Sequence, residues 1–157
     1  MNRASRNVRE EPAAGRVALR TFTKFMRAHS ALTSRLLPTI AGHGLTPTQF
    51  GILEALHHLG PMNQQIIGSK LLVSKGNITM VISNLVREGL VARRRVSGDR
   101  RQKLIVITAK GRRRMQRVFP DVARAIVGEL SVLSAAQQEQ LGALCRRLGQ
   151  GRGRGHR

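Results

Sequence analysis

The feature that most constrains the fold is a pair of short helical patterns over residues 63–87, separated by only a few residues. Asn63 precedes the first pattern and Ser74 the second, and each has a short polar side chain that can accept a hydrogen bond from the first helical turn. The second pattern has an apolar face of helical periodicity, formed by Ile78, Val81, Ile82 and Leu85. Two short helices joined by a tight turn form a helix-turn-helix, which the sequence therefore predicts.

Two strand patterns follow the helix pair directly. Residues 90–96 and 102–108 are rich in β-branched and apolar residues, and the cluster SGDRR between them has the composition of a turn. The sequence therefore predicts a β-hairpin behind the helix pair, which is the arrangement of a winged helix-turn-helix.

Longer amphipathic patterns flank this unit. One covers residues 16–41, and another begins after Thr108 and contains Pro120, which is expected to bend the helix. Ser134 and Gln137 have the spacing of a capping box and open a last helix. These helices carry more apolar surface than one small winged domain can cover, so we expect them to join two copies of the chain in a homodimer.

The expected fold is mainly α with a small β-hairpin wing. A winged helix-turn-helix at about residues 45–108 is flanked by dimerisation helices at about 16–41 and 109–148. Residues 1–15 are charged and without periodicity, and residues 149–157 form a basic tail in which glycine alternates with arginine. Both ends are therefore expected to be disordered.

The charge balance limits the possible partners. The chain has 28 Lys and Arg residues against 8 Asp and Glu residues, a formal charge of +20, which attracts nucleic acid or an anionic membrane. It contains no apolar run long enough to span a bilayer and no apolar core of a secretory signal in its first 15 residues, so we expect a cytoplasmic protein with no membrane partner. Aromatic residues make up 3% of the chain, which favours duplex DNA over stacked single strands.

The basic residues concentrate around the expected wing. Residues 87–117 contain 12 basic and 2 acidic side chains. Such a run can be no more than a solvated surface, but its coincidence with a helix-turn-helix and a hairpin favours DNA binding.

The second helix of the motif is expected to enter the major groove. Its N-terminal residues reach base edges in proteins of this kind. The residues that we expect to contact DNA from this helix are Ser74, Lys75, Gly76, Asn77, Thr79, Met80, Ser83, Asn84 and Arg87. Asn77 and Thr79 are candidates for reading adenine or thymine, and Gly76 permits a close approach to phosphate. Asn77 has an alternative interpretation, as a helix-start residue that satisfies its own backbone.

The wing supplies further candidates. We expect Arg94, Arg100, Arg101 and Lys103 to contact DNA, with Arg100 and Arg101 at the turn entering a minor groove. Asp99 is expected to orient an arginine through a charge-assisted hydrogen bond.

The segments LLVSKGNITMVISNLVREGLV and SGDRRQKLIVITAKGR resemble the MarR family of bacterial regulators, and the resemblance extends from about Leu19 to Leu148. It implies a sequence-specific transcriptional regulator, expected to be a repressor that binds a palindromic operator as a homodimer. Asp99 and Arg101 match the family's wing-tip acid and minor-groove arginine. Met80 and Ser83 depart from the family, because many members have arginine and an acid at these positions.

The resemblance also implies a small-molecule pocket between the dimerisation helices and the winged domain, often for phenolic or other aromatic anions. The residues in the corresponding region are Arg16, Arg20, Arg27, His29 and His43. Cys145, the single cysteine, is interpreted as a small buried hydrophobe at the dimer contact rather than as a redox sensor.

Other classes of function have less support. The sequence contains no phosphate-binding loop, nucleophile elbow, carboxylate pair at helical spacing or metal-ligand cluster, so we expect no enzyme, cofactor or metal site. The principal alternative is a non-specific architectural or nucleoid protein, because a charge of +20 can hold duplex DNA without base contacts.

Overall fold

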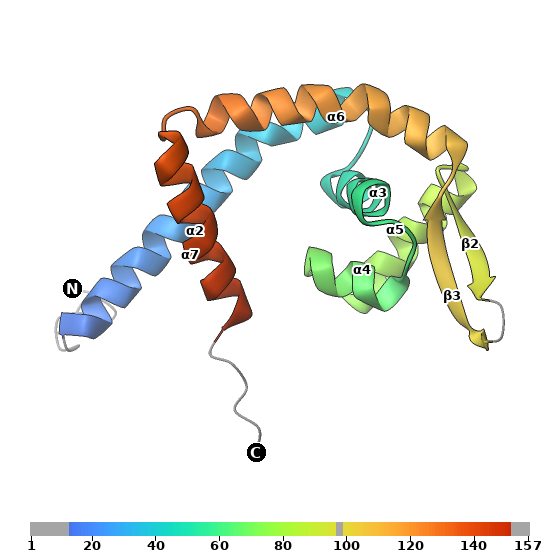
Figure 1. Ribbon diagram of the computed structural model, residues 1–157, viewed down its shortest axis with the longest axis horizontal. Coiled ribbons are helices and arrows are strands. Elements are labelled where there is room, and N and C mark those ends of the chain that lie inside the picture. The colour runs from blue at the N-terminus through green and yellow to red at the C-terminus, as the bar shows by residue number, and fades with distance from the viewer. Residues whose placement is uncertain (1–12, 97–98, 152–157) are drawn as a thin grey trace, which may run out of the picture. The chain divides into compact units, whose positions relative to one another are not determined.

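A computed structural model describes residues 13–96 and 99–151, with the backbone alone at residues 13, 14, 96 and 99–102. Its elements, shown in Figure 1, are α2 (Ala13–Gly42), α3 (Pro47–Leu59), β1 (Met62–Asn63), α4 (Gln64–Leu71), α5 (Lys75–Arg87), β2 (Val91–Val96), β3 (Asp99–Ile107), α6 (Ala109–Leu130) and α7 (Ala135–Gln150). The chain divides into two compact units, of which the first ends at Pro47 and the second begins at Thr48.

The first unit contains α2, a helix of 30 residues with Pro38 inside it. It begins at Ala13, within the segment that was expected to be disordered. Several of its large apolar side chains are exposed, and the most exposed of them is Phe22, at 63%. In the single chain, α2 therefore presents apolar surface to solvent.

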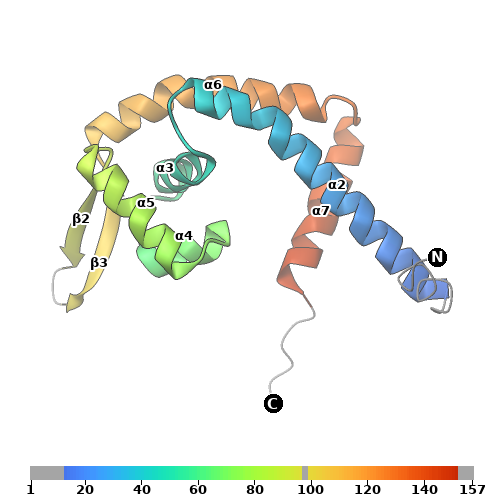
Figure 2. The same ribbon diagram turned by 180° about the vertical axis from the view of Figure 1, so that it is seen from behind.

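The second unit contains the helix-turn-helix and the wing. Strands β2 and β3 form the predicted antiparallel hairpin, and α5 contacts β2 beside it (Figure 2). Strand β3 begins at Asp99, within the segment predicted as the turn, because Asp99 already pairs with Val96. The sheet has a third strand, β1, which pairs with β3 and places Met62 opposite Ile105. This strand was not predicted, because two residues are too few to show the alternation by which strands are recognised.

The predicted helix caps are present. Asn63 accepts a hydrogen bond from the backbone of Ile66 and caps α4, and Ser74 and Thr108 cap α5 and α6 in the same way. Ser134 and Gln137 form the predicted capping box of α7. Helix α7 continues to Gln150, two residues further than the sequence pattern indicated.

The core of the second unit lies between its helices and the sheet. The apolar face of α5 is buried as predicted, with Ile82 and Leu85 at 0% exposure. The other fully buried side chains come from every layer of the unit and include Ile52, Leu53, Leu56, Ile67, Ile105, Met115 and Val118. These contacts hold α5 between α4 and the wing, with its polar face outward.

At Gly111, α6 lies directly against the segment that follows the helix-turn-helix. A Cβ atom added there would overlap the backbone oxygen of Leu90 and would lie 2.8 Å from Cγ1 of Ile107. The first of these contacts is with backbone, which cannot rotate out of the way. Only glycine therefore allows α6 to start so close to β2.

We predict that Gly111→Ala lowers the free energy of unfolding by about 3 kcal/mol, because the added methyl group forces α6 away from Leu90. Gly128→Ala is the matched control, since it lies in the same helix and a Cβ atom there meets nothing within 4 Å. The control should be neutral or stabilising by up to about 1 kcal/mol through its higher helix propensity. Urea unfolding measures both values, and equal stabilities of the two variants would contradict the close packing.

Candidate DNA-binding surface

The polar face of α5 is open to solvent. Ile78, Val81, Ile82 and Leu85 fill the core, so the side chains predicted to contact DNA lie on the outer surface of the helix. Ser74, Lys75, Gly76, Asn77, Thr79, Met80, Ser83 and Arg87 are exposed, and Asn84 is half-buried. The structure therefore brings the helix candidates together on one face.

Asn77 lies in the first turn of this face. Its backbone nitrogen donates to the Ser74 side chain, with a separation of 3.4 Å. Within the described part of the chain, the Asn77 side chain itself has no hydrogen-bond partner. Ser74, and not Asn77, is thus the residue that caps the helix, which leaves the Asn77 carboxamide available to a ligand.

The Thr79 side chain is hydrogen-bonded both within α5 and to α4. Its Oγ1 atom donates to the backbone oxygen of Lys75 at 2.8 Å and accepts a hydrogen bond from Nε2 of Gln64 at 2.5 Å. The Thr79 hydroxyl therefore ties α5 to α4 in this structure. The bond to Gln64 was not predicted, since nothing in the linear pattern brings residues 64 and 79 together.

Arg93 joins the wing to α5. Its Nη2 atom donates to Oγ of Ser83 at 2.9 Å. Arg93 pairs with Ile105, so both residues lie on the face of the sheet that also carries the buried Val91. Arg93 was not among the predicted site residues, although strand alternation from Val91 indicates its face.

Two wing residues predicted to bind DNA are described and exposed. Arg94 pairs with Leu104, and Lys103 pairs with Arg95, so Arg94 and Lys103 lie on opposite faces of the hairpin. Asp99, Arg100 and Arg101 begin β3, and their side chains lie outside the described residues. Their roles at the wing tip stay predictions.

The residues predicted to bind a small molecule are only partly brought together. Arg20 and Arg27, with Lys24 between them, line an open cavity of about 390 Å³ along one side of α2. Arg16 and His29 also lie on α2 but are not among the residues that line this cavity, and His43 follows the end of the helix, half-buried.

Three further features concern metal binding, membrane-spanning helices and the state of the cysteine. Among the described residues, no group of three or more His, Cys, Asp or Glu side chains could hold a metal ion. The same part of the chain has no helix long and apolar enough to cross a membrane. Cys145 is exposed in the single chain, so its predicted burial would require a partner subunit.

A helix-turn-helix packed against a three-stranded sheet with an extended basic hairpin defines the class of winged helix proteins. The sequence model of the MarR family matches residues 45–103, which include both helices of the motif and most of the wing. The HTH-type transcriptional regulator MhqR of Bacillus subtilis (strain 168) is 36% identical over 132 residues, which cover 84% of this chain and 91% of that protein. The chain belongs to the MarR family, whose members are transcriptional regulators and not enzymes.

Solved structures of regulators have the same fold. Sco3205, a MarR family transcriptional regulator from Streptomyces coelicolor in complex with DNA, matches with a TM-score of 0.76 and 19% identity over 90% of this chain and 92% of that one. NadR in complex with 4-hydroxyphenylacetate matches with a TM-score of 0.75 and 22% identity over 83% of this chain and 92% of that one.

A double-mutant cycle should detect the bond between the wing and α5. We predict a coupling of about 1 kcal/mol between Arg93→Ala and Ser83→Ala in urea unfolding, because each substitution alone breaks the same hydrogen bond. Arg94→Ala removes the same charge from the other face of β2, so its effect should add to that of Ser83→Ala within about 0.5 kcal/mol. Strict additivity in both pairs would show that Arg93 does not hold the wing.

Proposed function

We propose that the chain is a sequence-specific, double-stranded DNA-binding repressor that acts from the cytoplasm and binds a palindromic operator as a homodimer. The observation that carries this proposal is the exposed face of α5, on which the Asn77 carboxamide has no hydrogen-bond partner within the described residues. This helix lies beside a hairpin rich in arginine. Side chains suited to base edges are therefore next to side chains suited to the DNA phosphates. Sco3205, which has the same fold, was solved in complex with DNA, and this supports DNA as the partner.

The two elements are suited to different kinds of reading. An asparagine carboxamide forms two hydrogen bonds with adenine in the major groove, and an apolar side chain such as Met80, which is 60% exposed, can contact a thymine methyl group. Arg101 at the wing tip is suited to a narrow minor groove, where A·T tracts deepen the negative potential. We therefore expect an operator with A·T pairs at both contacts.

The homodimer is supported by the apolar side chains that the single chain leaves exposed. Phe22 and Phe25 are 63% and 40% exposed on α2, and Leu144 and Leu148 are 52% and 66% exposed on α7. A two-fold dimer would bury such side chains against their copies and present two recognition helices about 34 Å apart. The operator is then an inverted repeat with half-sites one helical turn apart.

The proposal includes a small-molecule effector. NadR binds 4-hydroxyphenylacetate, and the cavity beside Arg20 and Arg27 could pair with the carboxylate of a similar aromatic or phenolic acid. We propose such a compound as the ligand that releases the repressor from DNA.

Two substitutions separate sequence reading from charge. Asn77→Ala should weaken binding to the operator by about 1 to 3 kcal/mol per half-site and leave random duplex binding and the salt dependence almost unchanged. Arg101→Ala should weaken binding to every duplex and reduce the slope of log affinity against log salt by about 0.9 for each phosphate-type interaction that it removes. Fluorescence anisotropy at several salt concentrations measures both effects.

The outcome also decides between a regulator and an architectural protein. The wild-type chain should keep one site, selected from genomic fragments, against a large excess of competitor DNA. If it does not, and if both variants lose affinity equally on selected and random duplexes, α5 does not read sequence and the architectural alternative is correct.

The dimer is tested by placing a charge on its expected surface. Phe22→Lys and Leu144→Lys should each weaken dimerisation about a hundredfold or more, because an apolar side chain is removed from the interface of both copies. Leu59→Lys is the control, since Leu59 is 60% exposed at the end of α3, outside the expected interface. Sedimentation equilibrium gives the constants, and a wild-type chain that stays monomeric at micromolar concentration would refute the proposal.

A further inference from the structure

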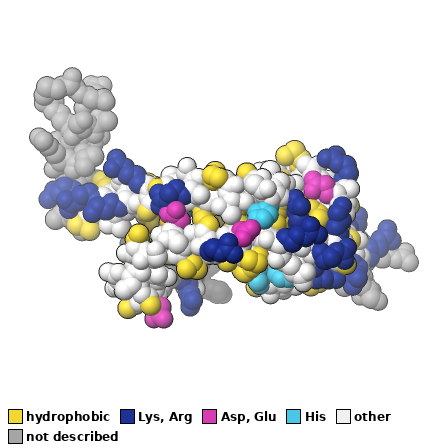
Figure 3. Space-filling view, turned by 90° about the horizontal axis from the view of Figure 1, so that it is seen from above, with side chains coloured by type: hydrophobic (Ala, Val, Ile, Leu, Met, Phe, Trp, Pro, Cys, Tyr) yellow, Lys and Arg dark blue, Asp and Glu magenta, His cyan; other side chains and the backbone are white. Residues whose placement is uncertain are grey.

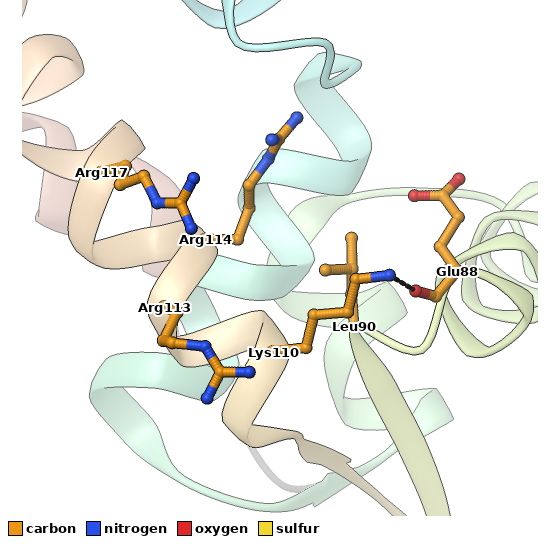
Figure 4. A pocket seen from close by; sticks show the side chains of 6 residues that line it. All are labelled: Glu88, Leu90, Lys110, Arg113, Arg114 and Arg117. Atoms are coloured by element: carbon orange, nitrogen blue, oxygen red, sulfur yellow. Dashed lines mark hydrogen bonds between the residues drawn. The ribbon is translucent and has the colours of Figure 1, made fainter.

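The first turns of α6 form a basic pocket that the proposed DNA contacts do not use. The pocket has a volume of about 540 Å³ and is lined by Glu88, Leu90, Lys110, Arg113, Arg114 and Arg117 (Figure 4). In Figure 3, Lys and Arg side chains gather over this end of α6. We call the site formed by these six residues the basic pocket.

Four cations line the pocket because of their spacing along α6. Positions 110, 113, 114 and 117 differ by three and four residues, so their side chains share one side of the helix. Lys110 reaches across to the end of α5, where its Nζ atom donates to the backbone oxygen of Glu88 at 2.7 Å. The pocket therefore lies along the side of α6, between this helix and the segment that leaves α5.

The Glu88 carboxylate does not form an ion pair with Arg113 or Arg117. Nε2 of Gln49 lies 3.4 Å from Oε1 of Glu88, and Figure 4 shows the Glu88 side chain across the pocket from Arg113 and Arg117. Within the described residues, Arg113 and Arg117 have no hydrogen bond or ion pair. Their guanidinium groups are thus available to an anion.

This cluster is unfavourable for the helix itself. Cations three and four residues apart repel each other, and those near the start of a helix also face the positive end of its dipole. The first turn of α6 contains no acidic residue that would offset this repulsion. A bound anion would relieve this repulsion. Anion binding therefore explains the cluster, whereas the stability of the helix does not.

The pocket also lies away from the groove-reading end of α5. Helix α5 has 13 residues, and at 1.5 Å per residue its ends are about 20 Å apart. Lys75 and Asn77 lie at its start, whereas Glu88 and the pocket lie beyond its end. Base reading by the first turn of α5 therefore does not occupy the pocket.

We propose that the basic pocket binds a small phosphate-bearing compound with at least two negative charges. Even without Arg114, the site holds the three cations Lys110, Arg113 and Arg117 against one carboxylate, so a multivalent anion matches its charge better than a monocarboxylate does. Arginine side chains match the oxygen geometry of phosphate, and the volume is in the range of small-molecule sites. This site goes beyond the proposed function and requires no DNA.

Pyrophosphate is the test compound, with ionic strength held constant by NaCl. The pocket variant Arg113→Gln/Arg117→Gln is compared with Arg146→Gln/Arg147→Gln, which removes the same charge from exposed positions of α7. In calorimetric titrations, the wild-type and control chains should bind one pyrophosphate per chain, and the pocket variant should bind at least tenfold more weakly. Equal weakening in both variants, or no saturable binding to the wild type, would overturn the proposal.

Thermal unfolding gives a second, independent reading. Without ligand, the pocket variant should melt at the wild-type temperature or above it, because like-charge repulsion is reduced. Pyrophosphate should raise the melting temperature of the wild-type and control chains and leave that of the pocket variant unchanged. An equal ligand-induced rise in all three chains would contradict the assignment to this pocket.

A DNA arm distinguishes the free compound from duplex phosphates. The pocket and control variants should bind a short duplex with the same salt dependence. If the pocket variant alone has a slope shallower by about 0.9 or more, the cations contact the DNA backbone, and the proposal of a small ligand is wrong.

Discussion

The arrangement of the second unit depends on a small polar junction around Leu90 and Thr108. The Thr108 backbone nitrogen donates to the Leu90 oxygen at 3.1 Å, and its Oγ1 atom lies 2.7 Å from the Gly89 oxygen. The same hydroxyl accepts a hydrogen bond from Gly111 at 3.0 Å. One threonine therefore joins the end of the helix-turn-helix, the base of the wing and the start of α6. Because Gly111 has no side chain, these three elements can approach this closely.

The fold could be predicted from the sequence wherever it rests on local signals. Asn63, Ser74 and Thr108 are capping residues whose role depends on the next three residues, and the hairpin depends on two adjacent strands. The features that were not predicted depend on contacts with residues far away in the sequence. Strand β1 exists because Met62 pairs with Ile105, and Thr79 is fixed by Gln64 on another helix. Neither contact leaves a periodic signal in the chain.

The candidate surface shows the same division. The exposed face of α5 follows from helical periodicity, so the sequence was enough to predict which residues share it. Their individual states required the structure, since Thr79 and Ser83 have partners on neighbouring elements whereas the Asn77 side chain has none within the described residues. Helix α5 is thus held in place by some of its polar residues and keeps others available for bases, which allows a rigid element to present a precise reading surface.

The polar junction also bears on how an anion in the basic pocket could influence DNA binding. Lys110 lines that pocket and at the same time donates to Glu88, the residue at the end of α5. An anion that draws Lys110 away from this carbonyl would remove one of the bonds between α6 and α5, whereas one that leaves it in place would only reduce repulsion. A ligand changes the affinity for DNA only if α5 and the wing have two arrangements that differ in DNA affinity. The ligand must then bind one of these arrangements more tightly than the other. The Lys110 bond is a contact through which such a difference would arise, since Lys110 lines the pocket and is hydrogen-bonded directly to Glu88 at the end of the recognition helix.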